Sequence, residues 1–363
     1  MSRSDDGLTG EEPLAPNTET LSGSASAPGD ELAIENIDVG AVVLDKYRVE
    51  RRIGGGGMAD VYEATHLTLG TRVALKFPLG RLASPRRFAR ILREAQVSAS
   101  LDPDRVVRVL DVASTALGVP VIVMELLEGE SLADRLAREG KLAPAVAARW
   151  VREACLGLVE AHARGIVHRD IKPSNLFVER RRGGVERLKL LDFGVASIRA
   201  AASQQASAQG DSGAVGSPPY MAPEQLNPDA RSPQVDARCD VWALGVTLFE
   251  LCAGRRPFVG KPVALVSSIL NDASPTLEDV GVSAPEPLKR VIARCLEKDR
   301  EERFRDAQAL ADALEGFAAP APLSSRVAPP SARVPRRRAF AWIAIAVVVT
   351  AILTTIVLLG WAR

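Results

Sequence analysis

Several kinds of feature are missing from this chain of 363 residues, and each absence excludes a class of protein. Lys plus Arg number 46 and Asp plus Glu number 45, so a net charge of +1 offers no general attraction to nucleic acid, and nucleic-acid binding is not expected. The four cysteines stand singly, which indicates neither a zinc site nor a disulfide framework and suits a reducing cytosol. No basic stretch followed by an apolar run opens the chain, so we expect no cleaved secretory signal.

Composition divides the chain into segments. Residues 1–44 are rich in Ser, Gly, Pro and acidic residues, so they cannot offset the entropy of ordering, and we expect a disordered acidic arm. Residues 47–317 keep their apolar content without a break and predict one α+β domain with two lobes. Residues 318–338, with prolines among Ala, Ser and Arg, predict an extended linker.

The composition changes abruptly at residues 339–359, which contain no charged side chain. As a helix they would be about 31 Å long, matching a hydrocarbon core of about 30 Å, and so they predict a transmembrane helix. A buried core helix is the alternative, but a helix that is apolar on all faces and placed after a proline linker has no evident domain in which to bury itself. Arginines before the segment predict that the preceding domain stays in the cytoplasm and that residues 360–363 form a short outer tail.

Small residues recur every four positions in this apolar segment, which fits either the seam of a homodimer or chance spacing toward membrane lipid. They are Ala346, Thr350 and Thr354.

Within residues 47–317 the spacing at which apolar residues recur changes once. From 47 to 123, short apolar runs broken by glycine turns predict a small strand-rich lobe, with one helix over 85–101 that carries Glu94. After Gly129, apolar residues recur at helical spacing and predict a larger, helical lobe. The residues expected to bury one face of its first long helix are Val146, Trp150, Val151, Cys155 and Leu158.

An ordered series of short motifs runs through both lobes. Transfer of a phosphoryl group from ATP requires a close backbone cover for the phosphates, a cation, a metal-holding carboxylate and amide, and a carboxylate beside the acceptor hydroxyl. The series supplies each of these. It consists of Ile53-Gly54-Gly55-Gly56-Gly57, Lys76, Glu94, His168-Arg169-Asp170, Asn175, Asp192-Phe193-Gly194 and Ala222-Pro223-Glu224.

The first motifs are weak when taken singly. Glycines 54–57 offer positions without Cβ where the backbone can approach phosphates, although a glycine cluster is more often a flexible turn. No Gly-Lys-Ser/Thr follows, which argues against a Walker-type loop. Lys76 would neutralise phosphates while Glu94 holds its ammonium group, whereas single charges are more often solvated surface groups. Their spacing after the glycines favours the phosphate role.

The segment from His168 to Asn175 is more specific. Asp170 would accept the proton of the acceptor hydroxyl, Lys172 would steady the transferring phosphate and Asn175 would bind a metal ion. Asp192, directly after an apolar strand, would hold Mg²⁺ against the phosphates. We expect His168 to brace the loop rather than to transfer protons. The other histidines, expected to be structural or exposed, are His66 and His162.

Together these motifs resemble a eukaryotic-type, Hanks-class protein kinase as found in bacteria, over residues 47–317. The resemblance implies the bilobal kinase fold, ATP with Mg²⁺ (Mn²⁺ as an alternative), and protein substrates. It places Met124 at the gatekeeper position and residues 125–127 at the hinge that binds adenine. The nucleotide-binding positions that it implies are Ile53, Gly54, Gly55, Gly56, Gly57, Val61, Ala74, Lys76, Met124, Glu125 and Leu127.

The acceptor class also follows from the resemblance. Lys172, and residues 216–220 ahead of Ala222-Pro223-Glu224, are similar to serine/threonine kinases rather than tyrosine kinases. Two departures are mild: Ser217 stands where the family usually has threonine, and Ala59 where it has the third glycine of its loop. The resemblance assigns structural roles to a buried aspartate and to an arginine that pairs with Glu224. These two residues are Asp240 and Arg303.

Residues 194–217 are rich in Ser, Ala, Gln and Gly and are expected to be mobile. One hypothesis is that phosphorylation of Ser203, Ser207 or Ser212 orders this segment through Arg169, and an inert loop is the alternative.

Two other functions are alternatives to a membrane-anchored kinase. A pseudokinase scaffold would usually have lost one of Lys76, Asp170 or Asp192, and all three are present. A small-molecule phosphotransferase is disfavoured by the Ala222-Pro223-Glu224 motif and by the long segment before it.

Overall fold

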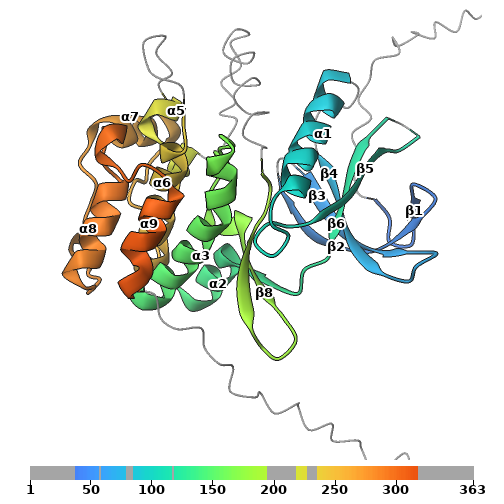
Figure 1. Ribbon diagram of the computed structural model, residues 1–363, viewed down its shortest axis with the longest axis horizontal. Coiled ribbons are helices and arrows are strands. Elements are labelled where there is room, and N and C mark those ends of the chain that lie inside the picture. Colours follow the sequence, from blue (N-terminus) through green and yellow to red (C-terminus); the bar gives the residue numbers. More distant parts are fainter. Residues whose placement is uncertain are drawn as a thin grey trace, which may run out of the picture.

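The computed structural model describes the chain from residue 37 to residue 317, with five internal gaps, as two lobes (Figure 1). The described ranges are 37–56, 59–78, 85–116, 118–193, 218–226 and 235–317. The linker, the apolar segment and residues 194–217 lie outside these ranges, so the expectations for them stay predictions. No helix within the described ranges combines the length and the apolar character needed to cross a bilayer.

A six-stranded antiparallel sheet forms most of the small lobe, in the order β1-β2-β3-β4-β6-β5. One of its faces carries a core in which Val49, Leu75 and Val123 are fully buried. On the same face the rings of Tyr62 and Phe77 meet edge to face at 5.7 Å. The predicted strand-rich lobe is confirmed. Its strands are β1 (Val42–Val43), β2 (Tyr47–Gly56), β3 (Ala59–His66), β4 (Arg72–Pro78), β5 (Val109–Ser114) and β6 (Pro120–Glu125).

The first described residues correct the expectation of a disordered arm as far as residue 44. β1 pairs with β2, aligning Val43 with Tyr47, and Val43 is buried against the lobe. The backbone N–H of Ile37 donates a hydrogen bond to the Tyr62 hydroxyl at 3.2 Å. The short apolar run before Tyr47 therefore makes enough contacts with the small lobe to become ordered. The average composition of residues 1–44 does not reveal this run.

Helix α1 (Pro85–Ser100) packs beside the sheet next to β5 and β6 (Figure 1). Ile91 and Ala95 are buried, one helical turn apart, while Glu94 is half-buried between them on the adjoining face. The predicted helix over 85–101 matches this element to within one residue. Glu94 is thereby brought to the cleft side of the small lobe.

The large lobe is helical, as predicted. Trp150, Val151, Cys155 and Leu158 of α3 are all buried, and Val146 is partly buried. Helix α6 passes through the centre of the core, and Gly245 allows its close approach to α8, since a Cβ there would overlap the Cβ of Cys295. The helices are α2 (Leu132–Glu139), α3 (Pro144–Ala163), α5 (Pro223–Leu226), α6 (Arg238–Ala253), α7 (Pro262–Asn271), α8 (Glu286–Cys295) and α9 (Ala307–Leu314).

A second, three-stranded sheet belongs to the same lobe and lies between its helices and the small lobe (Figure 1). It is formed by β7 (Gly129–Ser131), β8 (Leu176–Arg180) and β9 (Glu186–Leu190). β8 and β9 are antiparallel, with Leu176 opposite Leu190. Because β8 starts where β9 ends, the residue before β8 and the residues after β9 must lie close together.

Candidate active site

Asn175 and Asp192 are brought together by this β8–β9 pairing. Asn175 immediately precedes β8, and Asp192 follows β9 by two residues. The backbone N–H of Leu191 donates to the carbonyl oxygen of Asn175 at 2.9 Å, which extends the ladder to the site. The two residues predicted to hold a metal ion, 17 positions apart in the sequence, are thus neighbours.

Asp170 has two side-chain partners that fix its carboxylate. The Asn175 Nδ2 atom donates to the Asp170 carbonyl oxygen at 2.8 Å and to its Oδ2 atom at 3.0 Å. Lys172 Nζ lies 3.1 Å from the same Oδ2 atom. Asp170 and Asn175 are both buried, whereas Lys172 is partly exposed. The structure therefore brings together three of the residues that sequence reasoning assigned to phosphoryl transfer.

The backbone of the two residues before Asp170 is anchored by Asp240 of α6. This fully buried carboxylate accepts hydrogen bonds from the N–H of His168 at 2.8 Å and from the N–H of Arg169 at 2.7 Å. It also accepts one from His162 Nε2 at 2.9 Å, because His162 Nδ1 is itself an acceptor for the N–H of Ala307. Burial opposes ionisation of Asp240, but these donors outweigh it and hold its pKa below the ordinary value.

His162 is structural, which is one of the two possibilities expected from the sequence, but sequence reasoning did not connect it with Asp240. The histidine lies on α3, 78 residues before Asp240, and no local spacing connects the two. His168, in contrast, braces the loop as expected. Its Nε2 atom is 2.9 Å from the Leu191 carbonyl oxygen, and its ring packs against the ring of Phe193 with centroids 4.7 Å apart.

Two residues beside the carboxylates have unusual backbone conformations. Arg169 has φ of 63° and Asp192 has φ of 58°, in the left-handed region that non-glycine residues seldom occupy. Such conformations persist where the surrounding contacts over-determine them, and they cluster at functional sites. Here the anchor to Asp240 fixes the Arg169 peptide, while Asp192 turns its side chain into the cleft.

The partner of Lys76 differs from the sequence prediction. Among the contacts of the described residues, Lys76 forms an ion pair with Asp192 rather than with Glu94. Glu94 lies on the same cavity, which it lines from α1. Burial raises the pKa of Asp192, but the Lys76 ammonium more than compensates, so the pKa lies below its usual value. The left-handed turn at Asp192 gives Lys76 a nearer carboxylate, a geometric detail that motif spacing does not reveal.

The cavity is small, about 30 Å³, and mainly apolar where the two lobes meet. Phe193, from the segment after β9, closes one side of it, and Met124 and Ile122 of β6 line another. Met124 therefore lies at the back of the cleft, in keeping with the gatekeeper position. The remaining lining residues are Ala95, Ser98, Val107 and Val109.

Several of the predicted nucleotide positions of the sheet share the cleft side. Val61 pairs with Lys76 across β3 and β4, and Ala74 pairs with Met124 across β4 and β6, so partners point to the same face. Gly54 pairs with Val61. Ile53, Gly55 and Gly56 complete the described part of β2, and Gly57 lies outside the described residues.

The hinge begins at the end of β6. The side chain of Glu125 accepts the N–H of Arg108 at 2.8 Å and pairs with the buried Lys189 of β9. The backbone N–H of Glu125 donates to the Arg108 carbonyl oxygen at 3.0 Å. Leu127, two residues further on, is half-buried. The Glu125–Lys189 ion pair thus ties the connection between the lobes to the strand that leads to Asp192.

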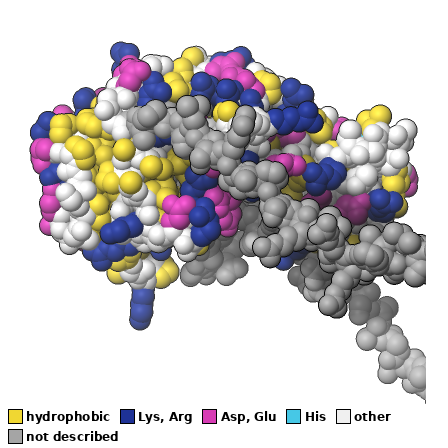
Figure 2. Space-filling view, turned by 90° about the horizontal axis from the view of Figure 1, so that it is seen from below, with side chains coloured by type: hydrophobic (Ala, Val, Ile, Leu, Met, Phe, Trp, Pro, Cys, Tyr) yellow, Lys and Arg dark blue, Asp and Glu magenta, His cyan; other side chains and the backbone are white. Residues whose placement is uncertain are grey.

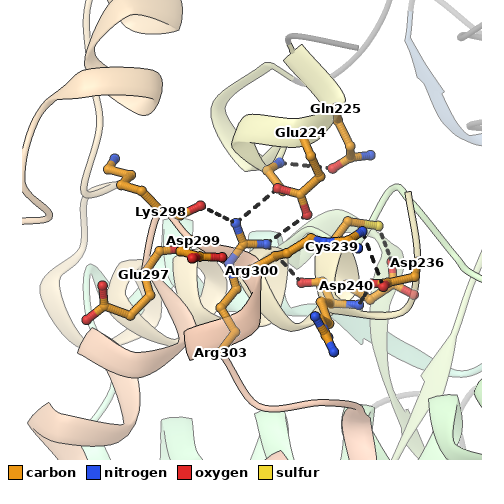
Figure 3. Close-up of polar contacts among 12 residues, drawn as sticks. Glu224, Gln225, Asp236, Cys239, Asp240, Glu297, Lys298, Asp299, Arg300 and Arg303 are labelled. Atoms are coloured by element: carbon orange, nitrogen blue, oxygen red, sulfur yellow. Dashed lines mark hydrogen bonds and ion pairs between the residues drawn. The ribbon is translucent and has the colours of Figure 1, made fainter. Parts of the chain in front are cut away.

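Glu224 is held by a fully buried arginine, as the resemblance implied (Figure 3). Arg303 Nη1 and Nη2 donate to the two carboxylate oxygens of Glu224 at 2.8 and 3.0 Å. The guanidinium also donates to the carbonyl oxygens of Glu297 and Lys298. This bidentate pair fixes α5, which carries Glu224, to the segment after α8, which carries Arg303. Glu224 lies shortly after residues 194–217 in the sequence.

The face shown in Figure 2 has no single sign of charge. Lys and Arg side chains there are interspersed with Asp and Glu side chains.

Comparisons with known proteins agree with this geometry. Residues 47–314 match the model of the family described as "Protein kinase domain". The chain belongs to the protein kinase family. It is 35% identical over 275 residues to "Serine/threonine-protein kinase pkn3" of Myxococcus xanthus, and 36% identical over 270 residues to "Serine/threonine-protein kinase PknB" of Mycobacterium tuberculosis. These matches cover 75% and 72% of this chain but 50% and 41% of the relatives, so this kinase spans half or less of their length.

Solved structures show the same fold. The crystal structure of the PknI kinase domain of Mycobacterium tuberculosis superposes with a TM-score of 0.59 at 26% sequence identity. The match covers 78% of this chain and the whole of the solved one. The bilobal protein kinase fold, with a small sheet lobe and a larger helical lobe, is therefore established for this kinase.

Proposed function

We propose that this protein transfers the γ-phosphoryl group of ATP to serine and threonine hydroxyls of proteins. The observation that carries the proposal is the set of contacts at Asp170, whose carboxylate is fixed by Lys172 and Asn175 beside the Lys76–Asp192 pair. Its relatives are serine/threonine-protein kinases, and Lys172 matches that class. In this role Asp170 orients the acceptor hydroxyl and receives its proton, while Lys172 steadies the transferred group.

The donor set at the site suits a magnesium ion. The Asp192 carboxylate and the Asn175 side-chain amide provide oxygen ligands, which Mg²⁺ prefers, with Mn²⁺ as an alternative. These two residues would hold the ion. When bound, it would neutralise charge on the phosphates. Lys76 and the glycines of β2 would position the nucleotide from the small lobe.

The test is Asp170→Asn, which preserves shape but removes the proton acceptor. Transfer from labelled ATP to a generic protein substrate should fall by at least about 100-fold, while affinity for Mg-ATP stays close to that of the parent. Asp312→Asn, an exposed carboxylate on α9, is the matched control and should retain full activity. If the parent binds ATP but labels neither itself nor any protein, the pseudokinase alternative replaces the proposal.

We further propose that phosphorylation within residues 194–217 raises activity. In the described part of the chain the buried Arg169 Nε atom has no hydrogen-bond partner, so its guanidinium retains a donor for a phosphate. Replacing Ser203, Ser207 and Ser212 with alanine should then lower activity after preincubation with Mg-ATP. Unchanged activity of the triple variant would support an inert loop instead.

Finally, we propose that residues 339–359 anchor the kinase in the cell membrane with its catalytic domain in the cytoplasm. The support is the length of this uncharged segment and the arginines before it. The full chain should sediment with membranes and resist extraction by salt, and a chain ending at residue 338 should not. Recovery of the full chain in the salt wash would contradict the anchor, and membrane crosslinking would show whether the small-residue seam forms a homodimer.

A further inference from the structure

An ion pair lies across the base of the glycine loop, on the face away from the cleft. Arg52 of β2 donates from Nε to Asp60 Oδ1 of β3 at 3.1 Å, and its Nη2 atom contacts the same oxygen. The Asp60 side chain is 11% exposed and the Arg52 side chain 50% exposed. The acceptor is therefore buried in the sheet, while the cation covers it from the solvent side.

A bulge in β2 makes this contact geometrically feasible. Arg52 pairs with Tyr62, but Gly54 already pairs with Val61, so Ile53 is an extra residue in β2. Without this bulge, Arg52 and Gly55, three residues apart, would point to opposite faces of the sheet. With it, both lie on the face of Asp60 and Tyr62. The opposite face carries Val61 and its partner Lys76, which points into the cleft.

Gly55 provides the space for this ion pair. It pairs directly with Asp60, and a Cβ built on it would overlap the Arg52 guanidinium and the Asp60 carboxylate. Its φ is not in the left-handed region, so the backbone conformation does not demand glycine. The absence of a side chain at Gly55 is therefore explained by room for Arg52 rather than by backbone geometry.

We propose that Arg52 and Asp60 form a clasp that holds the glycine loop in its nucleotide-binding arrangement, and that Arg52 is a positioning residue for ATP. The clasp joins β2 and β3 next to Gly54–Gly56, from the face that does not meet the nucleotide. A loop that is ordered before binding loses less conformational entropy on binding, so the clasp increases affinity for ATP without contacting it. This inference rests on the proposed kinase function.

The test compares Arg52→Met with Arg48→Met. Arg48 lies on the same strand, is also 50% exposed and pairs with Glu50 at 3.2 Å, but it is remote from the glycines. The affinity of the full-length protein for a non-hydrolysable ATP analogue with Mg²⁺ should fall by about twofold to fivefold in Arg52→Met, the range for one exposed ion pair. Arg48→Met should bind like the parent.

Two further measurements separate a clasp from simple stabilisation of the lobe. In Arg52→Met, KM for ATP should rise while kcat does not fall, and amide exchange within residues 51–62 should become faster. Asp60→Asn should have the same effects, and the double variant should be no weaker than either single one, because the contact can be lost only once. Additive losses in the double variant would overturn the clasp.

Gly55→Ala gives an independent check. In the parent it should weaken nucleotide binding as much as Arg52→Met does, because the new methyl group displaces the guanidinium. In the Arg52→Met background it should have little further effect. An equal loss in both backgrounds would mean that Gly55 acts by direct approach to phosphates, and would refute the clasp. If the parent itself binds no nucleotide, the proposed kinase function fails instead, so the two failures are distinguishable.

Discussion

Asp240→Asn tests the anchor behind the catalytic loop most directly. The substitution keeps the size of the side chain but removes its charge and turns one acceptor into a donor. One oxygen of Asp240 accepts two hydrogen bonds, from the N–H of His168 and from His162, and the other accepts one from the N–H of Arg169 and a weak one from the Cys239 thiol at 3.9 Å. The best orientation of an asparagine keeps its oxygen toward the two donors and places its NH₂ group against the N–H of Arg169.

The magnitude follows from this count. One hydrogen bond to a charged group is lost, worth about 1.5–3 kcal/mol, and the two that remain lose their charge assistance. Part of this loss is offset, because a buried charge no longer has to be desolvated. We expect the free energy of unfolding to fall by about 2–4 kcal/mol and the melting temperature to fall by roughly 5–15 °C.

Activity should fall as well, by at least about tenfold, because the His168 and Arg169 peptides lead directly into Asp170. The assays are thermal unfolding and protein phosphorylation below the unfolding temperature, with Asp312→Asn as the control. Because the folded-state pKa of Asp240 is depressed, its contribution is present above the ordinary value of 3.8 and is lost as the pH falls through the folded pKa. The stability gap between parent and variant should therefore be constant from about pH 5 to 7 and shrink below about pH 4. A gap that persists unchanged to lower pH, or a variant as stable as the parent, would refute the reasoning.

Three other substitutions probe the large lobe. Arg303→Met leaves the Glu224 carboxylate, whose side chain is 10% exposed, without its partner and should cost about 3–5 kcal/mol in urea unfolding, and adding Glu224→Gln should recover part of that loss; no recovery would argue against the pair as the cause. Burial lowers the pKa of Lys298 to about 8, so between that pH and its ordinary 10.5 its contribution to stability should rise with pH, and Lys298→Met should make the pH slope of stability less positive than in the parent; equal pH slopes for parent and variant would contradict this. Gly245→Ala should lower stability by about 1–3 kcal/mol through overlap with Cys295, and calorimetry that finds no change would show that α6 and α8 can separate at no cost.

The fold and most of the site could be predicted because the chemistry restricts the residues. A transferable phosphoryl group requires a lysine, two carboxylates and an amide, and only a few spacings bring Asp170, Asn175 and Asp192 together. The buried face of the helix that carries Trp150 and Leu158 could be predicted, because burial of one face makes apolar residues recur at helical spacing. Local sequence patterns therefore predicted the helices and strands and the motif residues that lie on them.

Contacts made across long stretches of sequence could not be predicted in the same way. The choice of Lys76 between Glu94 and Asp192 depends on a left-handed turn at Asp192, which no spacing encodes. The hydrogen bond between His162 and Asp240 joins α3 and α6, and no local sequence pattern indicates that these two helices meet there. The glycine motif predicts a phosphate-binding loop, but the reason for Gly55 becomes visible only once β2 and β3 are paired.

At this site the carboxylates of Asp170 and Asp192 each already pair with a lysine of the protein. Asp192 pairs with Lys76, and Asp170 with Lys172. Entry of Mg-ATP would therefore exchange ionic partners instead of neutralising isolated charges. Lys76 would transfer from a carboxylate to phosphate oxygens, and Asp192 from an ammonium to the metal. Since both exchanges replace one ion pair with another, the net electrostatic gain of binding is a small difference between large terms. Under that condition a modest contribution to ordering, such as that of the Arg52–Asp60 clasp, becomes a measurable part of the affinity.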